Sequence, residues 1–124
     1  MERPDYSALA DILEEMNKEG GFRASILARD DGLLMASAAS PTTNREVVAA
    51  MSGYVASTVE RMRDELGLGQ LRDITVRCYE GKAVFKKVPG TRQPFILAAL
   101  MPKRIRYHAR AIGKAATKIR HLMK

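Results

Sequence analysis

The sequence has few of the residues that hold metal ions or form cross-links. Its 124 residues include one cysteine, Cys78, and two histidines, His108 and His121. A single cysteine excludes an intramolecular disulfide, and so few Cys and His side chains cannot assemble a structural zinc site. The two histidines lie about 20 Å apart along a predicted helix, so they cannot share a site. We therefore expect no metal and no cofactor, Cys78 in the core, and both histidines among solvated basic residues.

Long hydrophobic runs are also missing. The longest uncharged stretch, residues 47–59, is rich in small residues and is shorter than the roughly 20 apolar residues of a membrane span. The start of the chain, residues 1–5, lacks the basic-then-apolar pattern of a secretory signal. Together these absences predict a cytoplasmic protein.

Catalytic motifs are absent as well. Gly67 and Gly69 lack the third glycine and the preceding strand of a dinucleotide-binding loop. Gly113 and Lys114 are followed by Ala115, where a nucleotide-binding P-loop needs Ser or Thr to ligate magnesium. No pair of carboxylates and no nucleophile with a neighbouring base is indicated. We expect the protein not to be an enzyme.

Charge is placed unevenly along the chain. The net charge is +7, yet residues 103–124 hold eight Lys or Arg and no acid, so the rest of the chain is nearly neutral. We predict a basic helix over residues 103–124. Four of its cations step by four positions, so that surface could bind nucleic acid, an anionic membrane or an acidic protein, or could simply face solvent. These possible anion-binding residues are Arg106, Arg110, Lys114 and Lys118.

Hydrophobic periodicity predicts one domain over residues 1–124 with the order α-β-β-α-β-β-β-α. Hairpin turns at residues 30–32 and 80–81 favour antiparallel pairing, and helices long enough to cover both faces indicate an α/β three-layer sandwich. The sheet should have five mainly antiparallel strands. The predicted helices are residues 7–19, 43–66 and 103–124, and the predicted strands are 22–29, 33–38, 71–79, 82–88 and 95–101.

The middle helix, opened by a capping box at Thr43 and Glu46, has two candidate packing faces. Its larger apolar residues form a stripe predicted to pack on the sheet: Val48, Met51, Val55, Val59, Met62 and Leu66. Small residues, Gly53 among them, form a neighbouring row. A glycine inside a helix lowers helix stability by about 0.5–1 kcal/mol relative to alanine. A close backbone approach would explain that cost, either by the protein's own sheet or by the same helix of a second copy. We predict the second case, a dimer interface of Ala49, Gly53, Ala56, Ser57 and Glu60.

Several motifs support a family resemblance. They are Asp31-Gly32-Leu33 at the first hairpin, residues 46–51 opening the long helix, residues 66–71 entering the third strand, and Glu80-Gly81 at the second hairpin. With this element order, the chain resembles the roadblock / dynein light chain family. The resemblance implies a roadblock, profilin-like fold and a homodimer or heterodimer in which the long helices pack together and the third strands pair. The dense charge of the last helix departs from the family pattern.

Two functions follow as hypotheses. Members of the family typically act as non-catalytic partners, scaffolds or regulators of small Ras-like GTPases, or as motor-complex light chains. The resemblance therefore implies a dimeric, non-catalytic scaffold or regulator of a small Ras-like GTPase. The alternative is a basic module that docks on nucleic acid or an anionic membrane through the C-terminal helix.

Overall fold

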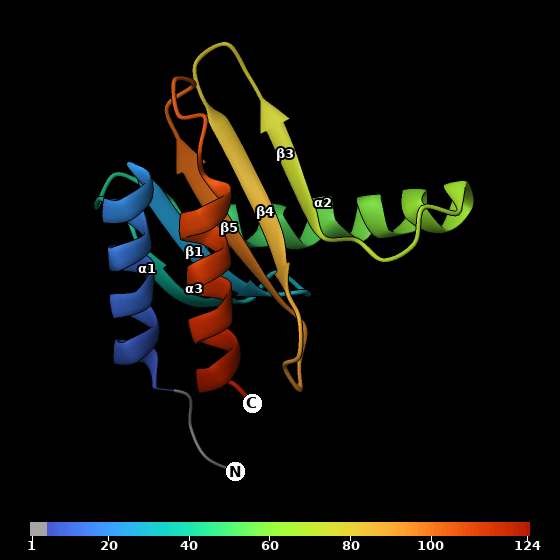
Figure 1. Ribbon diagram of the computed structural model, residues 1–124, viewed down its shortest axis with the longest axis horizontal. Coiled ribbons are helices and arrows are strands. Elements are labelled where there is room, and N and C mark those ends of the chain that lie inside the picture. Colours follow the sequence, from blue (N-terminus) through green and yellow to red (C-terminus); the bar gives the residue numbers. More distant parts are fainter. Residues whose placement is uncertain (1–4) are drawn as a thin grey trace.

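The computed structural model describes residues 5–124 as three helices and five strands (Figure 1). The first four residues, which belong to the segment expected to lack a signal sequence, lie outside the described part. The elements are α1 (Tyr6–Gly20), β1 (Ala24–Arg29), β2 (Leu34–Ala38), α2 (Arg45–Leu66), β3 (Asp73–Arg77), β4 (Lys82–Val88), β5 (Phe95–Met101) and α3 (Ala109–Leu122).

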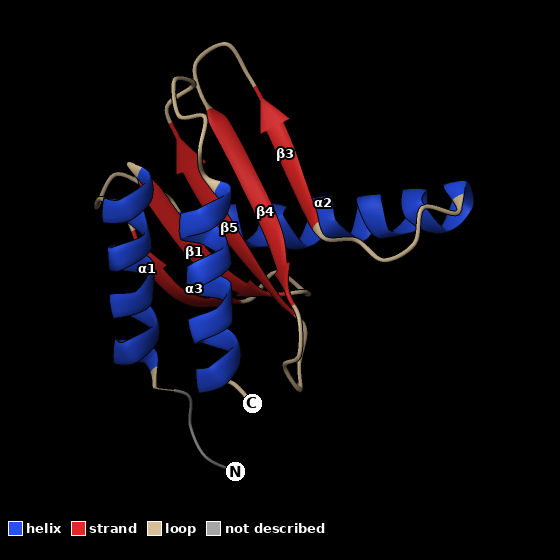
Figure 2. Cartoon of the chain, viewed as in Figure 1, coloured by secondary structure: helices blue, strands red, loops and turns tan. Residues whose placement is uncertain are grey.

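The five strands form one sheet in the order β2-β1-β5-β4-β3, and all neighbouring strands are antiparallel. Helices α1 and α3 lie side by side on one face of this sheet, and α2 lies on the other (Figure 2). The predicted three-layer sandwich and its element order are confirmed. The continuously apolar strand 95–101 is β5 at the centre of the sheet, and its residues are almost all buried, as its composition requires.

The core has two unequal layers. The larger layer joins the sheet to α1 and α3, whose periodic apolar residues Leu9, Leu13, Ile112 and Ile119 are almost completely buried. On the other face the contact is thinner, because α2 meets the sheet through small side chains such as Ala49 and Ala56. The short side chains bring the helix axis close to the strands.

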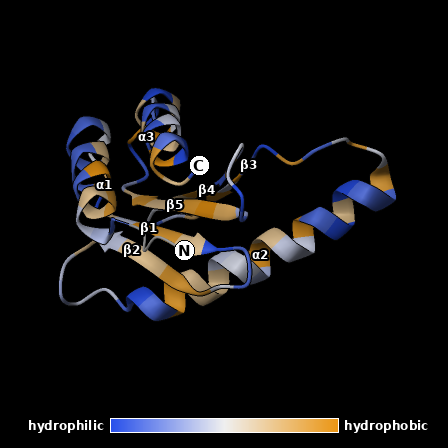
Figure 3. Ribbon diagram, turned by 90° about the horizontal axis from the view of Figure 1, so that it is seen from below, coloured by the Kyte–Doolittle hydropathy of each residue, from blue (hydrophilic) through white to orange (hydrophobic). Residues whose placement is uncertain are grey.

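Helix α2 begins and ends at clear sequence signals. The side chain of Asn44 accepts a hydrogen bond from the Val47 amide at 3.2 Å, so Asn44 is the N-cap in place of the predicted Thr43. Gly67 ends the helix in a left-handed conformation with φ of 64°. The helix crosses β1, β2 and β5, and its C-terminal half projects beyond the edge strand β3 (Figure 3).

Two predicted segments differ in the structure. Strand β3 is shorter than predicted and most of its residues are exposed, so Cys78 lies in an exposed turn and its predicted core position is wrong. The basic helix begins at Ala109 and not at residue 103, because a turn closed by the Ile105 amide and the Pro102 carbonyl interrupts the chain.

Within residues 5–124, no helix combines the length and apolarity needed to cross a membrane.

Candidate functional site

The small-residue row of α2 packs against the protein's own sheet. Ala49, Gly53 and Ala56 are buried, and a Cβ atom added to Gly53 would lie 2.8 Å from the backbone nitrogen of Gly32. Gly32 itself has φ of 90° in the β1–β2 turn. The close approach inferred from the sequence is therefore real but intramolecular. Their own sheet covers Ala49, Gly53 and Ala56, and their place in a dimer interface stays a prediction.

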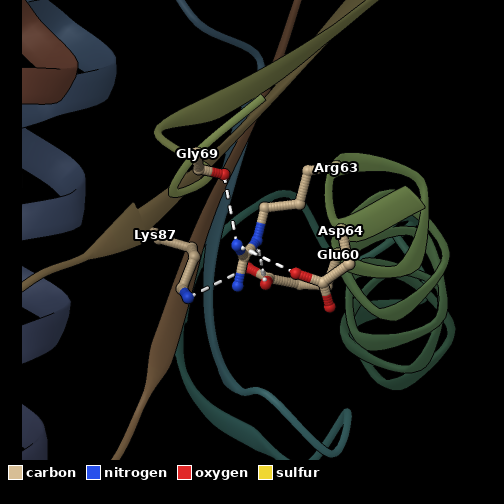
Figure 4. A network of polar contacts seen from close by, with 5 residues as sticks. All are labelled: Glu60, Arg63, Asp64, Gly69 and Lys87. Atoms are coloured by element: carbon tan, nitrogen blue, oxygen red, sulfur yellow. Dashed lines mark hydrogen bonds and ion pairs between the residues drawn. The ribbon is translucent and has the colours of Figure 1, made fainter. Parts of the chain in front are cut away.

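Glu60 also points toward its own chain. Its carboxylate accepts hydrogen bonds from Arg63 Nε at 2.8 Å and from Lys87 Nζ of β4 at 3.0 Å (Figure 4). Arg63 in turn donates to the Gly69 carbonyl at 3.2 Å and forms an ion pair with Asp64 at 3.1 Å. Hydrogen bonds from Arg63 and Lys87 lower the pKa of Glu60. This network braces the projecting half of α2 against β4, and the interface role of Glu60 stays a prediction.

The outer face of α2 carries large apolar side chains that none of residues 5–124 covers. Tyr54 is 77% exposed, and neighbouring positions at helical spacing are exposed as well. Apolar segments recur along α2 as far as its free end (Figure 3). We call this set the outer row: Val47, Met51, Tyr54, Met62 and Leu66.

The outer row reverses part of the sequence prediction. Met51, Met62 and Leu66 were predicted to pack on the sheet, but the short residues take that side. The sequence analysis missed Val47 and Tyr54, although their spacing of four and three from Met51 is a helical signal. Ser57 is the one residue of the predicted interface that is exposed, and it flanks this row.

Strand β3 leaves one backbone edge of the sheet unpaired. It pairs with β4 on one side and ends the strand order on the other. Such an edge offers backbone hydrogen-bonding groups to a further strand. Val76 is exposed on this strand. The outer row and the free edge together form the candidate interaction surface.

The row of cations predicted on the C-terminal helix divides in the structure. Lys114 forms an ion pair with Glu19 at 2.7 Å, and Lys118 forms one with Glu15 at 3.1 Å, so α1 neutralises both. The hydrogen bond from Lys114 lowers the pKa of Glu19. Arg110 stays exposed on α3, whereas Arg106 lies in the loop before it. The four side chains therefore do not present one uniform basic face.

The side chains that could ligate a metal are scattered over the described residues. No group of three or more His, Cys, Asp or Glu side chains in residues 5–124 could hold a metal ion. His108 departs from its predicted solvated position, because it is half-buried with Nδ1 3.2 Å from Lys82 Nζ. His121 is exposed, as expected.

Comparisons with known proteins agree with this architecture. An uncharacterised protein of Methanocaldococcus jannaschii is 32% identical over 73 residues, which are 59% of this chain and 64% of that protein. The chain thus spans less than two thirds of that relative. The solved structure of Myxococcus xanthus MglB superposes with a TM-score of 0.87 at 12% identity, covering 98% of this chain and 91% of MglB. A structure of MglB with a tetrameric arrangement gives a TM-score of 0.85 at 13% identity, covering 99% and 93%.

The two structural matches establish the fold alone, because sequence identities of 12% and 13% are too low to show more. Family membership comes from the sequence itself. The profile of the Roadblock/LC7 domain matches residues 9–88, which run from α1 through β4 and include the whole of α2 and β3. The predicted resemblance is thereby confirmed, and the chain belongs to the Roadblock/LC7 domain family.

Proposed function

We propose that the protein is a cytoplasmic, non-catalytic, dimeric scaffold or regulator of a small Ras-like GTPase. The observation that carries the proposal is the uncovered apolar outer row of α2. Membership of the Roadblock/LC7 family supports a GTPase-associated role, and the tetrameric arrangement in an MglB structure supports assembly into oligomers.

The outer row has the chemistry of a helix-to-helix contact. Burying an exposed side chain the size of Met51 or Leu66 is worth about 1.5–3 kcal/mol. Because two-fold symmetry brings the same patch of both copies together, a self-complementary row on a single helix suits a homodimer. Residues 47–59 carry no charge, so two copies can meet there despite a net charge of +7 on each chain. The free edge of β3 would extend the contact by strand pairing.

The alternative function has less support. Docking on nucleic acid or an anionic membrane through the C-terminal helix needs free cations along that helix. Lys114 and Lys118 are instead paired with acids of α1. A homodimer that regulates a GTPase is therefore the function that we retain.

The dimer is tested by light scattering at micromolar protein concentration. We expect the wild type to have the mass of a dimer and Tyr54→Arg to have the mass of a folded monomer, because the new cations would meet at the helix pair. Thr117→Arg is the matched control, since it adds the same side chain at an exposed site on α3. A monomeric wild type, or a Tyr54→Arg dimer as tight as the wild type, would contradict the proposal.

The GTPase role is tested with purified Ras-like GTPases of the source organism. Each is loaded with GDP or with a non-hydrolysable GTP analogue and passed over the immobilised protein. We expect at least one to bind in a nucleotide-dependent way, and moderate salt to change that binding little. If the protein dimerises but no GTPase binds in either nucleotide state, the dimer stands and the regulatory role fails.

A further inference from the structure

A basic cleft lies at the end of the sheet where β3 and β5 end and β4 begins. It is bounded by the β3–β4 hairpin and by the loop of residues 103–108, which approach each other at the top of Figure 1. Its volume is about 560 Å³. Four of the side chains that line it are cations, and no carboxylate of residues 5–124 lines it. These cations are Arg77, Lys82, Lys103 and Arg106.

Lys82 is the buried cation of this group. It is 8% exposed, and its ammonium group donates to the Ile105 carbonyl at 2.5 Å and contacts His108 Nδ1 at 3.2 Å. Neither contact supplies a negative charge, and no ion pair joins Lys82 to an acid within the described residues. Buried charges in proteins are normally paired with an opposite charge. The site of Lys82 therefore lacks a counter-ion.

The strand register adds a second unfavourable contact. Arg77 lies directly opposite Lys82 in the β3–β4 ladder, so two cations project from the same face of the sheet. Like charges at directly opposed positions destabilise a ladder. Burial and the charge of Arg77 lower the pKa of Lys82, and burial, Lys82 and Arg77 lower the pKa of His108. Asp73 acts on His108 in the opposite sense but does not line the cleft. An anion in the cleft would relieve this repulsion.

We propose that this cleft binds the phosphate groups of a small molecule that carries two or more of them. Arginine side chains form bidentate hydrogen bonds with phosphate oxygens, and Arg77 and Arg106 lie on the two walls of the cleft. Several phosphates match four cations better than a single carboxylate does. Helix α3 begins just after this loop, and its first turn has no acidic residue to repel an anion.

Calorimetric titration of the full chain with inorganic pyrophosphate tests the proposal. We expect saturable binding of one pyrophosphate per chain. The double variant Arg77→Gln/Arg106→Gln should weaken it at least about tenfold, because each charged hydrogen bond contributes strongly. Both arginines are exposed, so the fold should be retained. The matched control is Arg110→Gln/Lys124→Gln, which removes two exposed positive charges outside the cleft and should change the affinity less than about twofold.

Two further measurements sharpen the test. Bound pyrophosphate should raise the pKa of His108, followed by its ring resonances in NMR spectra, because a nearby anion favours the imidazolium form. Co-sedimentation with phosphatidylcholine vesicles that contain phosphatidylinositol bisphosphate distinguishes the sources of phosphate. Vesicle binding that depends on Arg77 and Arg106 assigns the cleft to a lipid headgroup, and pyrophosphate binding without vesicle binding assigns it to a soluble molecule. Absence of both, or equal losses in the two double variants, would overturn the proposal.

Discussion

Gly53 and Gly32 set the distance between α2 and the sheet. The added Cβ of an alanine at position 53 would approach the Gly32 nitrogen to 2.8 Å, a separation that real Cβ atoms essentially never show. The neighbours are backbone atoms of a tight turn, which cannot rotate away as a side chain could. The glycine therefore serves packing within the chain, and the helical cost of about 0.5–1 kcal/mol is offset by the close contact that it permits.

We predict that Gly53→Ala lowers the free energy of unfolding by about 1–3 kcal/mol, the usual range for overpacking a tight contact. Gly113→Ala is the matched control. It also lies inside a helix, but its added Cβ would meet nothing within 4 Å. We expect that control to stabilise the protein by about 0.5–1 kcal/mol. Urea denaturation measures both changes. If Gly53→Ala were as stable as Gly113→Ala, the close approach of α2 to the β1–β2 turn would be disproved.

At the scale of elements, periodicity predicted where helices and strands occur better than which face they bury. Every helix and strand was predicted in the right order, because capping residues and the alternation of strands are local signals. The buried face of α2 was predicted only in part: Val48 packs against the sheet as expected, but most of the face is made by the small residues. Hydrophobicity alone favoured Met51 and Met62 for the sheet, whereas the short distance to Gly32 admits only small side chains.

The basic cleft could not be predicted from the sequence either, because it depends on how distant segments are brought together. It depends on the register that places Arg77 opposite Lys82 and on the turn that separates Arg106 from α3. Neither the register of a hairpin nor a break before a helix can be read from charge spacing. The sequence analysis therefore assigned Arg106 to a helical row with Lys114, although the structure places the two side chains in different surroundings.

The network around Glu60 is expected to hold the projecting half of α2. We predict that Glu60→Gln lowers stability by up to about 1 kcal/mol, since the pairs with Arg63 and Lys87 are partly exposed. Amide hydrogen exchange should quicken in residues 57–66 and stay unchanged in residues 45–52. The pKa of Glu60 is lowered in the folded state. Its contribution to the free energy of unfolding is therefore present above the unfolded pKa and is lost as pH falls through the folded pKa. The free energies of unfolding of Glu60→Gln and the wild type should therefore converge in acid.

Glu65→Gln is the control for this network, because Glu65 is an exposed residue of the same helix half that joins no ion pair among the described residues. It should leave both stability and exchange unchanged. Equal exchange rates in Glu60→Gln and the wild type would show that the projecting half of α2 is held by other contacts.

At the scale of the whole molecule, the two sides of the sheet differ in electrostatic character. The side covered by α1 and α3 carries ion pairs between those helices, such as Lys114 with Glu19, whereas the ion pairs of α2 gather around Glu60 and Arg63, away from its outer row. The opposite side presents the uncharged outer row. The net charge of +7, most of it from residues 103–124, opposes the association of two copies, although the contact surface itself is apolar.

This separation predicts opposite salt responses for the two proposed interactions. Raising the sodium chloride concentration from about 50 mM to about 500 mM screens the repulsion between two cationic chains, so the proposed dimer should tighten severalfold. The apolar contact itself is not weakened by screening. Pyrophosphate binding depends on the attraction of cations for an anion and should weaken over the same range. Sedimentation velocity measures the first response and calorimetry the second. A dimer that loosened with salt would show that ion pairs, and not the outer row of α2, hold the two copies together.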